Sequence, residues 1–250
     1  MGSRFNNFLF RTANTLLKPL YKVYEKWLWQ QIKNGPVPEH IAIIPDGNRR
    51  WATVLGIEPW KGHYYGYNKV KDVLSWCWEL GVKIVTIYAL STENLRNRDK
   101  KELEELFKIF ERGFKEIAES SHIHEKKVRV KVIGRKNMLP ESIIDLVRRV
   151  EKETENYDSH YLNIALGYGG RAEITDAVKM LVEDALNGKI KLEEINENLI
   201  SKYLYTRDLP KPDPDLIIRT SGEERLSGFL LWQSAYSELY FCDVYWPEFR

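Results

Sequence analysis

The stretch HIAIIPDGNRRW, residues 40–51, joins a run of aliphatic residues to a cluster of polar ones. The run is short and rich in isoleucine, so it predicts a buried β-strand over His40–Ile44. The cluster that follows combines a carboxylate, a glycine, an amide and two guanidinium groups, which belong to Asp46, Gly47, Asn48, Arg49 and Arg50. Glycine allows close backbone approach, N–H groups at a helix start favour an anion, and arginine forks match phosphate oxygens. The end of this strand therefore predicts a phosphate site, although an Asp-Gly turn with surface arginines would contain the same residues.

Asp46 is the residue of this cluster that a phosphate would repel, because both groups carry negative charge. A magnesium ion prefers carboxylate and phosphate oxygens, and it would resolve the conflict by lying between them. We therefore predict Mg²⁺ as a cofactor, with Asp46 among its ligands.

Similar runs recur along the chain and alternate with longer segments in which apolar residues have helical spacing. The expected strands are His40–Ile44, Val82–Ala89, Lys127–Ile133, Tyr161–Leu166, Asp215–Arg219 and, with a weaker pattern, Glu238–Phe241. This alternation predicts an α/β fold with a mostly parallel sheet that is covered on both faces. One helical segment, Leu103–Phe114, is rich in leucine and phenylalanine, which suits either the protein core or the wall of an apolar tunnel. The charged segment Asp99–Glu105 is interpreted as the solvated start of a helix.

Polar clusters follow most of these strands, and parallel strands would bring them to one edge of the sheet. That edge is where open α/β sheets bind ligands. The cluster after the fifth strand repeats the chemistry of the first, with Arg219, Ser221, Gly222, Arg225 and Ser227. A helix cap with a local ion pair of Glu223 or Glu224 is the alternative interpretation. Two cationic sites at one edge would indicate two phosphorylated ligands.

Two other polar motifs permit more than one interpretation. Ser91-Thr92-Glu93-Asn94 follows the second strand, where its side chains could orient a substrate, accept a proton or simply cap a helix. Gly167-x-Gly169-x-x-Ala172 matches the relaxed dinucleotide fingerprint, but it follows the fourth strand instead of the first. A dinucleotide-dependent oxidoreductase is therefore an alternative function. The sequence contains no Gly-x-x-x-x-Gly-Lys-Ser/Thr motif, which argues against a P-loop nucleotide hydrolase.

The composition is that of a globular protein. Its 250 residues suffice for one large domain or two small ones, and 43% apolar with 30% charged residues excludes disordered, collagen-like and disulfide-rich classes. A net charge of +2 is too small for a protein that coats nucleic acid. Cys77 and Cys242 form no Cys-x-x-Cys motif, so a cytoplasmic location is expected. No apolar stretch reaches the roughly 20 residues that span a bilayer, and no signal peptide is evident.

Residues 1–35 are predicted to form a helical extension, and residues 36–250 a single domain. Apolar residues recur at helical spacing in the extension, at Leu16, Leu17, Leu20, Tyr24, Trp27, Leu28 and Ile32. Pro19 predicts a kink or restart, and Gly35-Pro36 ends the segment. We expect this apolar stripe to pack on the domain. Contact with a membrane surface is the alternative, because lysines flank the aromatic residues, namely Lys18, Lys22, Lys26 and Lys33.

Four motifs together resemble a known family. They are His40–Trp51, Gly62-His63, Tyr88–Asn94 and the run DLIIRTSGEERLSGFLLWQSAYSE over Asp215–Glu238. In this order they are similar to the cis-prenyltransferases, the undecaprenyl and dehydrodolichyl diphosphate synthases. The resemblance covers the chain from Gly35 to its last residue. The paired arginines and the N-terminal helix resemble the archaeal and eukaryotic branch more than the bacterial one.

The resemblance implies a six-stranded sheet surrounded by helices, in one catalytic domain that usually forms a homodimer. It implies a long-chain cis-polyprenyl diphosphate synthase, which adds isopentenyl diphosphate to an allylic diphosphate and uses Mg²⁺. Geranylgeranyl or farnesyl diphosphate would be the starter, and the product would be a glycosyl-carrier lipid precursor such as undecaprenyl diphosphate. Such an enzyme would lie in the cytoplasm, with peripheral membrane association for product release. A non-catalytic partner subunit is the alternative, but such subunits tend to lack the metal-linked aspartate, here Asp46.

The resemblance also implies roles for single residues. Asp46 is similar to the magnesium-linked aspartate that helps the allylic diphosphate leave, and Glu238 to a glutamate that completes the metal site. The allylic diphosphate would be held by Gly47, Asn48, Arg49 and Arg50, with Trp51 and His63 nearby. Further substrate contacts would come from Ser91, Thr92, Glu93 and Leu226, and the isopentenyl diphosphate site from Arg219, Arg225 and Ser227. Asn94 matches a residue assigned to proton removal, and Ala89 a small residue near the mouth of the product tunnel.

Two departures from the bacterial pattern leave roles open. Lys61 would replace, as a point charge, an arginine that precedes the Gly-His pair in bacterial relatives. The segment after Asn94 reads Leu95-Arg96-Asn97-Arg98, where those relatives have an aromatic residue and, two residues further on, an arginine. The roles of Leu95 and Asn97 are therefore open, and Arg98 is a candidate replacement for that arginine.

Overall fold

The structure, a computed structural model, describes residue 20 and residues 23–250. Six strands form one sheet in the order β3-β4-β2-β1-β5-β6, and every neighbouring pair is parallel. The strands are β1 (His40–Ile44), β2 (Ile84–Ser91), β3 (Val128–Ile133), β4 (His160–Tyr168), β5 (Leu216–Arg219) and β6 (Glu238–Phe241). The predicted α/β fold is confirmed, and every strand begins and ends within two residues of its expected bounds.

Helices connect most of the strands. The α-helices are α2 (Asn48–Val54), α3 (Gly62–Glu79), α4 (Thr92–Asn97), α5 (Lys100–Glu119), α6 (Ser121–Glu125), α7 (Glu141–Glu153), α8 (Gly170–Leu186) and α9 (Glu197–Ser201). Short 3-10 helices are η1 (Pro59–Lys61), η2 (Lys136–Met138), η3 (Leu192–Glu194) and η4 (Trp246–Glu248). Helix α5 begins where its sequence provides an N-cap, because the Asp99 side chain accepts from the Lys101 N–H at 2.7 Å. Its buried face includes Leu106, Ile109 and Phe114 at helical spacing.

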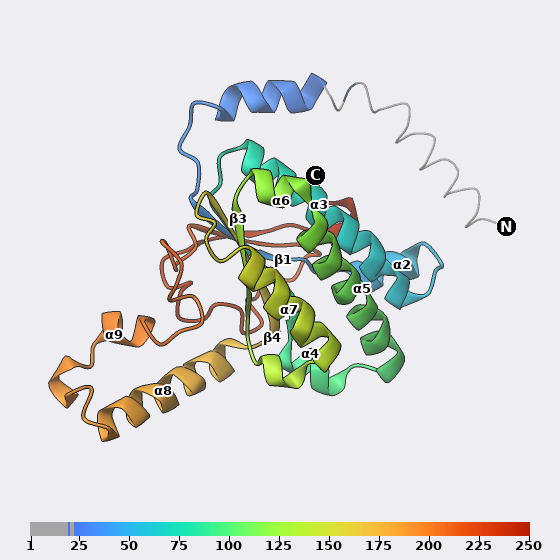
Figure 1. Cartoon of the computed structure of the whole chain (residues 1–250). Helices are drawn as coiled ribbons and strands as arrows, with labels where there is room; N and C mark the ends of the chain where they lie inside the picture. The colour runs from blue at the N-terminus through green and yellow to red at the C-terminus, as the bar shows by residue number, and fades with distance from the viewer. Residues whose placement is uncertain (1–19, 21–22) are drawn as a thin grey trace.

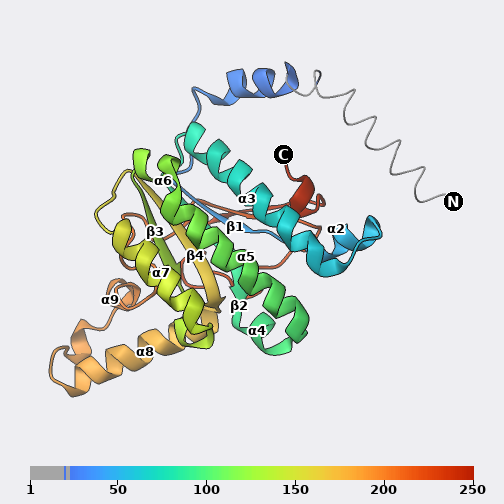
Figure 2. The same ribbon diagram turned by 45° about the vertical axis from the view of Figure 1, so that its right-hand side comes forward.

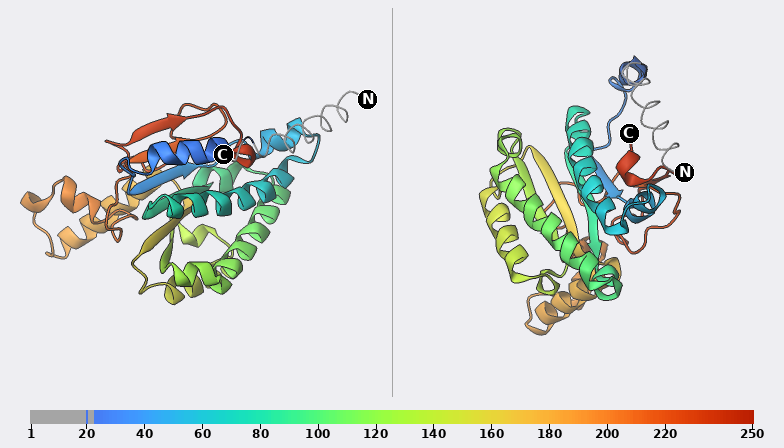
Figure 3. Two further views of the ribbon diagram at one scale, coloured as in Figure 1. Left: turned by 90° about the horizontal axis from the view of Figure 1, so that it is seen from above. Right: turned by 90° about the vertical axis from the view of Figure 1, so that its right-hand side faces the viewer.

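Alternate strand residues point to opposite faces of the sheet and build two apolar cores. On one face, α3, α5 and α7 cover strand residues such as Ile43, Val85 and Val130 (Figures 2 and 3). On the other face, the segment after β5 supplies Phe229 and Leu230, which have no exposed surface. The core of the first face therefore lies under helices, and that of the second lies under a loop.

The strand order explains where a ligand site can form. The chain leaves β1 toward β2, and it later returns to the other side of β1 with β5. Ile44 pairs with Arg219 at the ends of β1 and β5. The loops that follow these two strands therefore meet at the carboxyl edge, at the switch point where α/β sheets bind ligands.

The helix of residues 23–32 stands apart from the rest of the fold (Figure 1). Its side chains are all exposed, including Tyr24 at 52%, Trp27 at 53% and Ile32 at 48%. The prediction that the apolar stripe packs on the domain is therefore wrong for its described part, because residues 33–37 carry the chain away, exposed, before β1 begins. Residues 1–19, 21 and 22 lie outside the described residues, and so do the calls that fall on them. In the part of the chain that the structure describes, no helix is long and apolar enough to span a bilayer.

Candidate active site

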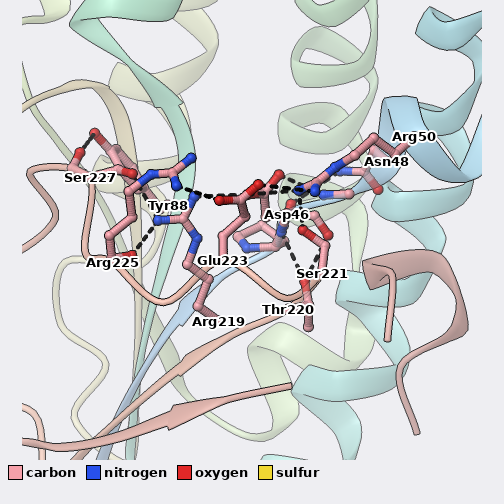
Figure 4. A network of polar contacts seen from close by, with 12 residues as sticks. Asp46, Asn48, Arg50, Tyr88, Arg219, Thr220, Ser221, Glu223, Arg225 and Ser227 are labelled. Carbon is pink, nitrogen blue, oxygen red and sulfur yellow. Dashed lines mark hydrogen bonds and ion pairs between the residues drawn. The ribbon is translucent and has the colours of Figure 1, made fainter. Parts of the chain in front are cut away.

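Asp46 lies in the loop just after β1, where it faces the loop that follows β5 (Figure 4). Its Oδ2 accepts a hydrogen bond from Arg219 Nη2 at 2.8 Å, and its Oδ1 accepts one from the Gly47 N–H at 2.7 Å. The Arg50 guanidinium lies 3.5 Å from the same Oδ2. The Thr220 hydroxyl fixes the Asp46 backbone, because it accepts from the N–H at 3.0 Å and donates to the carbonyl at 2.8 Å. The carboxylate is thus held between two cations while 32% of the side chain stays exposed.

Gly47 is required by both its backbone and its surroundings. Its φ of 96° lies in the left-handed region, which favours glycine. A Cβ at this position would lie 2.6 Å from Ser221 Cβ and 2.7 Å from Tyr245 Cδ1. No side chain fits there, so the loops after β5 and β6, which carry Ser221 and Tyr245, pack directly against the turn.

Arg50 and Glu223 make a second link between the loops. Arg50 Nη1 donates to Glu223 Oε1 at 3.0 Å, and Arg50 Nη2 donates to the Ser221 hydroxyl. Glu223 also accepts from Arg225, so the local ion pair considered as an alternative is present. Because these pairs are partly exposed, each contributes little to stability, and the guanidinium groups stay available to an anion.

The Glu102 carboxylate of α5 lies within 4 Å of three basic side chains, on another side of the site. Its Oε1 accepts from Arg98 Nη1 at 2.6 Å and lies 3.0 Å from His63 Nε2. Its Oε2 lies 3.7 Å from Arg49 Nε. Burial alone would raise the pKa of Glu102, but the hydrogen bond from His63 and the charges of Arg98 and Arg49 hold it below its usual value. Burial lowers the pKa of His63, which keeps its ring neutral at pH 7.

Arg219, the last residue of β5, is only 4% exposed. Besides its bond to Asp46, it donates from Nη1 to the Ser227 hydroxyl at 2.8 Å and to the Arg225 carbonyl. The Tyr88 hydroxyl lies 3.4 Å from the Ser227 carbonyl oxygen. Arg219 therefore ties the carboxylate of one loop to the backbone and hydroxyl of the other.

Two polar pockets meet at this edge of the sheet. They share Pro45, Asp46, Asn48, His63 and Arg98. The first, of about 520 Å³, lies over the start of α2 and includes Arg49 and Arg50. The second, of about 280 Å³, includes Arg219 and Ser227. The arrangement can hold two anions side by side.

An apolar cavity begins where the second pocket ends. Ala89 of β2 lines both spaces, and the cavity, of about 290 Å³, continues between α3 and α5. Its walls include Leu74, Trp78, Ile109 and Phe110. Helix α5 contributes to the core, as one interpretation of Leu103–Phe114 expects, and it also lines the cavity. A hydrocarbon chain could extend from the polar pockets past Ala89.

The residues present fit a magnesium ion that arrives with a phosphorylated ligand. Asp46 presents a partly exposed carboxylate to both pockets. Mg²⁺ is usually bound through one or two carboxylates together with phosphate oxygens and water. The described residues contain no group of three or more His, Cys, Asp or Glu side chains that could hold a metal ion without such a ligand.

Comparison with known proteins agrees with this geometry. Residues 44–250 match the family described as "Putative undecaprenyl diphosphate synthase". The chain belongs to the cis-prenyltransferase family. It is 54% identical over 249 residues to the tritrans,polycis-undecaprenyl-diphosphate synthase (geranylgeranyl-diphosphate specific) of Methanopyrus kandleri. The aligned region covers 100% of this chain and 91% of that relative. The protein of the same name in Methanocaldococcus jannaschii is 52% identical over 229 residues, covering 92% of this chain and 81% of the relative.

Solved structures agree with the same assignment. The structure of lavandulyl diphosphate synthase from Lavandula x intermedia in complex with dimethylallyl diphosphate has a TM-score of 0.81 at 34% identity, over 85% of this chain and 90% of that one. A probable undecaprenyl diphosphate synthase from Campylobacter jejuni has a TM-score of 0.68 at 30% identity, over 85% and 89%. The high identity to archaeal relatives supports the expected archaeal branch of the cis-prenyltransferases.

Most residues predicted for a cis-prenyltransferase site lie in the walls of the two polar pockets. They are Asp46, Gly47, Asn48, Arg49, Arg50, His63, Ser91, Glu93, Asn94, Arg219 and Ser227. Asn48 also packs against Gly66 of α3, where a Cβ would lie 2.2 Å from its Oδ1. The Ser91 hydroxyl accepts from the Asn94 N–H at 2.9 Å, so the predicted helix cap is present as well.

Four predicted substrate contacts lie beside the pockets. The Trp51 ring packs on Tyr65, with centroids 4.7 Å apart. Leu226 packs on the core under the loop, and Thr92 lies against the turn that precedes α8. The Arg225 side chain is 63% exposed. Their binding roles remain predictions.

Glu238 is the predicted metal ligand that the structure separates from Asp46. Parallel pairing puts Glu238 opposite Leu216 at the start of β5, whereas Asp46 lies beside the other end of β5, at Arg219. Three residues of strand correspond to roughly 10 Å. A single copy of the chain therefore does not bring the two carboxylates to one cation, and a metal role for Glu238 remains a prediction.

Glu102 is a site residue that sequence reasoning missed. It belongs to Asp99–Glu105, interpreted as solvated, yet it is 9% exposed. Its spacing of four residues from Arg98 was the available signal, because such pairs lie on one helix face. Arg98 lines both polar pockets, as expected for a replacement arginine. Lys61 instead lies over the Trp60 ring and lines neither pocket.

The dinucleotide fingerprint has a structural explanation. The Gly170 N–H at the start of α8 donates to the Gly228 carbonyl at 2.7 Å, so it is not free for a phosphate. The Gly167 carbonyl accepts from the Arg135 N–H at 3.0 Å. These glycines serve close contacts between loops of the protein itself.

Proposed function

We propose that this protein is a long-chain cis-polyprenyl diphosphate synthase that condenses isopentenyl diphosphate units with an allylic diphosphate. The observation that carries the proposal is the junction of three spaces, two cationic pockets that share Asp46 and an apolar cavity that begins at Ala89. The pockets suit two diphosphates, and the cavity suits the hydrocarbon that grows from one of them. Family membership and the archaeal relatives support the same reaction.

The pocket over α2 suits the allylic diphosphate. Arg49, Arg50 and Arg98 supply guanidinium groups, and the neutral His63 ring supplies a further hydrogen-bonding group. The pocket at the end of β5 suits isopentenyl diphosphate, because Arg219 and the Ser227 hydroxyl meet there.

Mg²⁺ would be held by Asp46 together with diphosphate oxygens. When bound, it would neutralise negative charge on the leaving diphosphate. Glu238 is an additional ligand only if it comes from another copy of the chain. A magnesium requirement is tested by adding a chelator and then restoring the metal, and an activity indifferent to both would argue against it.

The chain's own side chains account for the rest of the reaction. The allylic carbon–oxygen bond breaks, and its electron pair leaves with the diphosphate, whose charge the preset guanidinium groups of the first pocket stabilise. The alkene of isopentenyl diphosphate donates its electron pair to the allylic carbon, and loss of one proton restores an alkene. Asn94 lines the second pocket and is our candidate for assisting that proton loss.

Geranylgeranyl diphosphate is the proposed starter, because the names of the archaeal relatives specify it. The decisive experiment supplies radiolabelled isopentenyl diphosphate and Mg²⁺ with either farnesyl or geranylgeranyl diphosphate. A ladder of long polyprenyl products, such as undecaprenyl diphosphate, is expected with the geranylgeranyl starter. No incorporation by the folded protein would favour a non-catalytic partner subunit.

A homodimer through strand β6 is also proposed. β6 is the last strand of the sheet, and its Leu239 and Tyr240 are 47% and 54% exposed, with Tyr236 nearby at 97%. An edge strand with exposed apolar side chains offers unpaired backbone groups to a second copy. Sedimentation equilibrium should give twice the chain mass, and Leu239→Glu should shift it to monomer. A wild-type monomer would contradict this.

The N-terminal helix is proposed to contact a membrane surface from the cytoplasmic side, as an extension separate from the catalytic domain over residues 36–250. Trp27, Trp29 and Ile32 are exposed on it, and Lys26 and Lys33 flank them. Aromatic residues and lysines suit the interface of an anionic bilayer. The full chain should float with vesicles that contain anionic lipid, and the double variant Trp27→Ser/Trp29→Ser should not. Equal flotation of both proteins would show that these two tryptophans of the helix do not mediate membrane contact.

A further inference from the structure

Residues 226–233 form the loop that carries Ser227, and this loop has an unusual backbone. Ser227 and Leu230 have φ values of 49° and 44°, a left-handed conformation that L-residues other than glycine rarely adopt. Such a backbone is strained, so the surrounding structure must hold the loop in place. Phe229, between them, has no exposed surface and stacks on Tyr88 with centroids 4.6 Å apart.

The first turn of α8 packs directly against this loop. The Gly170 N–H donates to the Gly228 carbonyl at 2.7 Å. A Cβ at Gly170 would lie 2.7 Å from Leu231 Cγ and 2.8 Å from the Gly228 oxygen. The loop and the helix start are therefore in direct contact, with no space between them for a side chain.

Glu173, one turn further along α8, makes the second attachment. Its Oε1 accepts from Gln233 Nε2 at 3.1 Å and from the Tyr205 N–H at 2.8 Å, and its Oε2 accepts from the Tyr168 hydroxyl. Glu173 and Gln233 are each 1% exposed. Gln233 also donates to the Thr206 hydroxyl at 3.0 Å. A buried carboxylate that accepts from three donors fixes the residue that ends the loop.

Glu173 can influence the second pocket only indirectly, through the loop. Glu173 lines neither polar pocket, so it cannot touch a ligand there. It acts on the loop through Gln233 and, through Tyr168, on the aromatic cluster under Phe229. Ser227 is the loop residue that reaches the second pocket and meets Arg219.

We propose that Glu173 is a positioning residue for the isopentenyl diphosphate site, which it shapes by holding Gln233 and thereby the loop that carries Ser227. This inference rests on the function proposed above. It requires that loss of the attachment weakens the binding of isopentenyl diphosphate and leaves that of the allylic substrate unchanged, because the first pocket draws none of its walls from this loop.

The test uses an exchange of the two side chains. Gln233→Glu removes the amide that donates to Glu173 and Thr206 and brings two buried carboxyl groups together, which disrupts the attachment of the loop whether the pair repels or shares a proton. We expect the KM for isopentenyl diphosphate to rise about tenfold or more, with the allylic KM within about twofold of wild type. Glu173→Gln, which preserves shape, should give a smaller rise. The double variant Glu173→Gln/Gln233→Glu restores one amide and one carboxylate, so it should recover most of the loss.

The controls separate positioning from stability and from the function itself. Glu183→Gln, an exposed glutamate of the same helix, should leave both KM values unchanged. Thermal unfolding of each variant identifies a protein that no longer folds, and Glu173→Gln then provides the kinetic comparison. An equal rise in both KM values, or no recovery in the double variant, would overturn the proposal. A wild-type protein that neither incorporates nor binds isopentenyl diphosphate would instead refute the proposed function, and the positioning role with it.

Discussion

Arg219 Nη2 donates to Asp46 Oδ2 at 2.8 Å, which joins the end of β5 to the loop after β1. Arg219 is 4% exposed, and a buried cation that loses its partner is strongly destabilising. The same carboxylate faces both polar pockets. Asp46 therefore serves the structure by neutralising Arg219, and it is available to both proposed diphosphate sites at once.

Asp46→Ala should nearly abolish turnover in a protein that still folds but is less stable, because Arg219 loses its partner. Loss of the carboxylate removes the proposed magnesium ligand, and we expect a fall of at least about a hundredfold in kcat. Asp46→Asn is the matched control, because it retains a hydrogen-bond acceptor for Arg219 but lacks the charge. Steady-state kinetics with circular dichroism make the comparison. Unchanged turnover in either variant would remove the Asp46 charge from the mechanism.

Arg219→Ala should raise the KM for isopentenyl diphosphate more than the KM for the allylic starter. Arg219 contributes to the pocket of Ser227 and not to the pocket over α2. Arg219→Lys keeps the charge without the fork that reaches both Ser227 and Asp46, so it should recover only part of the affinity. A larger effect on the allylic KM would mean that the two sites are exchanged.

Glu102→Gln should weaken the binding of the allylic diphosphate. The change removes the charge that faces Arg49, Arg98 and His63. Because Arg49 lines only the pocket over α2, a rise of about tenfold in the allylic KM is expected, with a smaller change for isopentenyl diphosphate. Glu104→Gln, an exposed neighbour on the same helix, is the control. Equal kinetics of the two variants would show that the pocket does not depend on Glu102.

The architecture was predictable because its signals are local. Apolar runs such as His40–Ile44 report buried parallel strands directly, and the polar residues that follow them must then share an edge. The proximity of Asp46 and Arg219 followed from that rule, although they are 173 residues apart. The family resemblance assigned roles within the edge, but it did not supply contacts.

Other features depend on register and on tertiary contacts, which sequence patterns do not carry. Glu238 lies in a correctly predicted strand, yet its position at the start of β6 separates it from Asp46. Glu102 belongs to a charged segment that is typical of a solvated helix start, and it is buried only because α5 packs against the site. The N-terminal helix is exposed although its apolar stripe predicted packing on the domain, because such a stripe does not specify which surface covers it.

Acid should destabilise the protein through His40. Its ring lies between the Thr86 hydroxyl at 2.8 Å and the Lys211 carbonyl at 3.0 Å, and burial lowers its pKa from 6.5 to about 4. The unfolded state therefore binds more protons between pH 6.5 and 4, so stability is fully present above this window and falls as pH drops through it. The loss amounts to about 3 kcal/mol.

Urea midpoints of the wild type and of His40→Gln at several pH values would measure this contribution. We expect the variant to be less stable at pH 7.5, because it disturbs the His40 hydrogen bonds, but its midpoint should fall less steeply between pH 6.5 and 4. Identical slopes for the two proteins would show that another group is responsible.

Ala89→Phe should shorten the product. Ala89 lines both the second polar pocket and the apolar cavity, so a large ring there would narrow the passage through which a growing chain extends. The first condensations need little of the cavity and should continue, while later ones stop once the chain meets the ring. The product ladder, resolved by chain length after incorporation of radiolabelled isopentenyl diphosphate, should shift to shorter species with the total incorporation reduced. Ala89→Gly, which widens the same point, should retain the long products. A wild-type ladder from Ala89→Phe would mean that the chain does not pass Ala89 and that the cavity between α3 and α5 is not its tunnel.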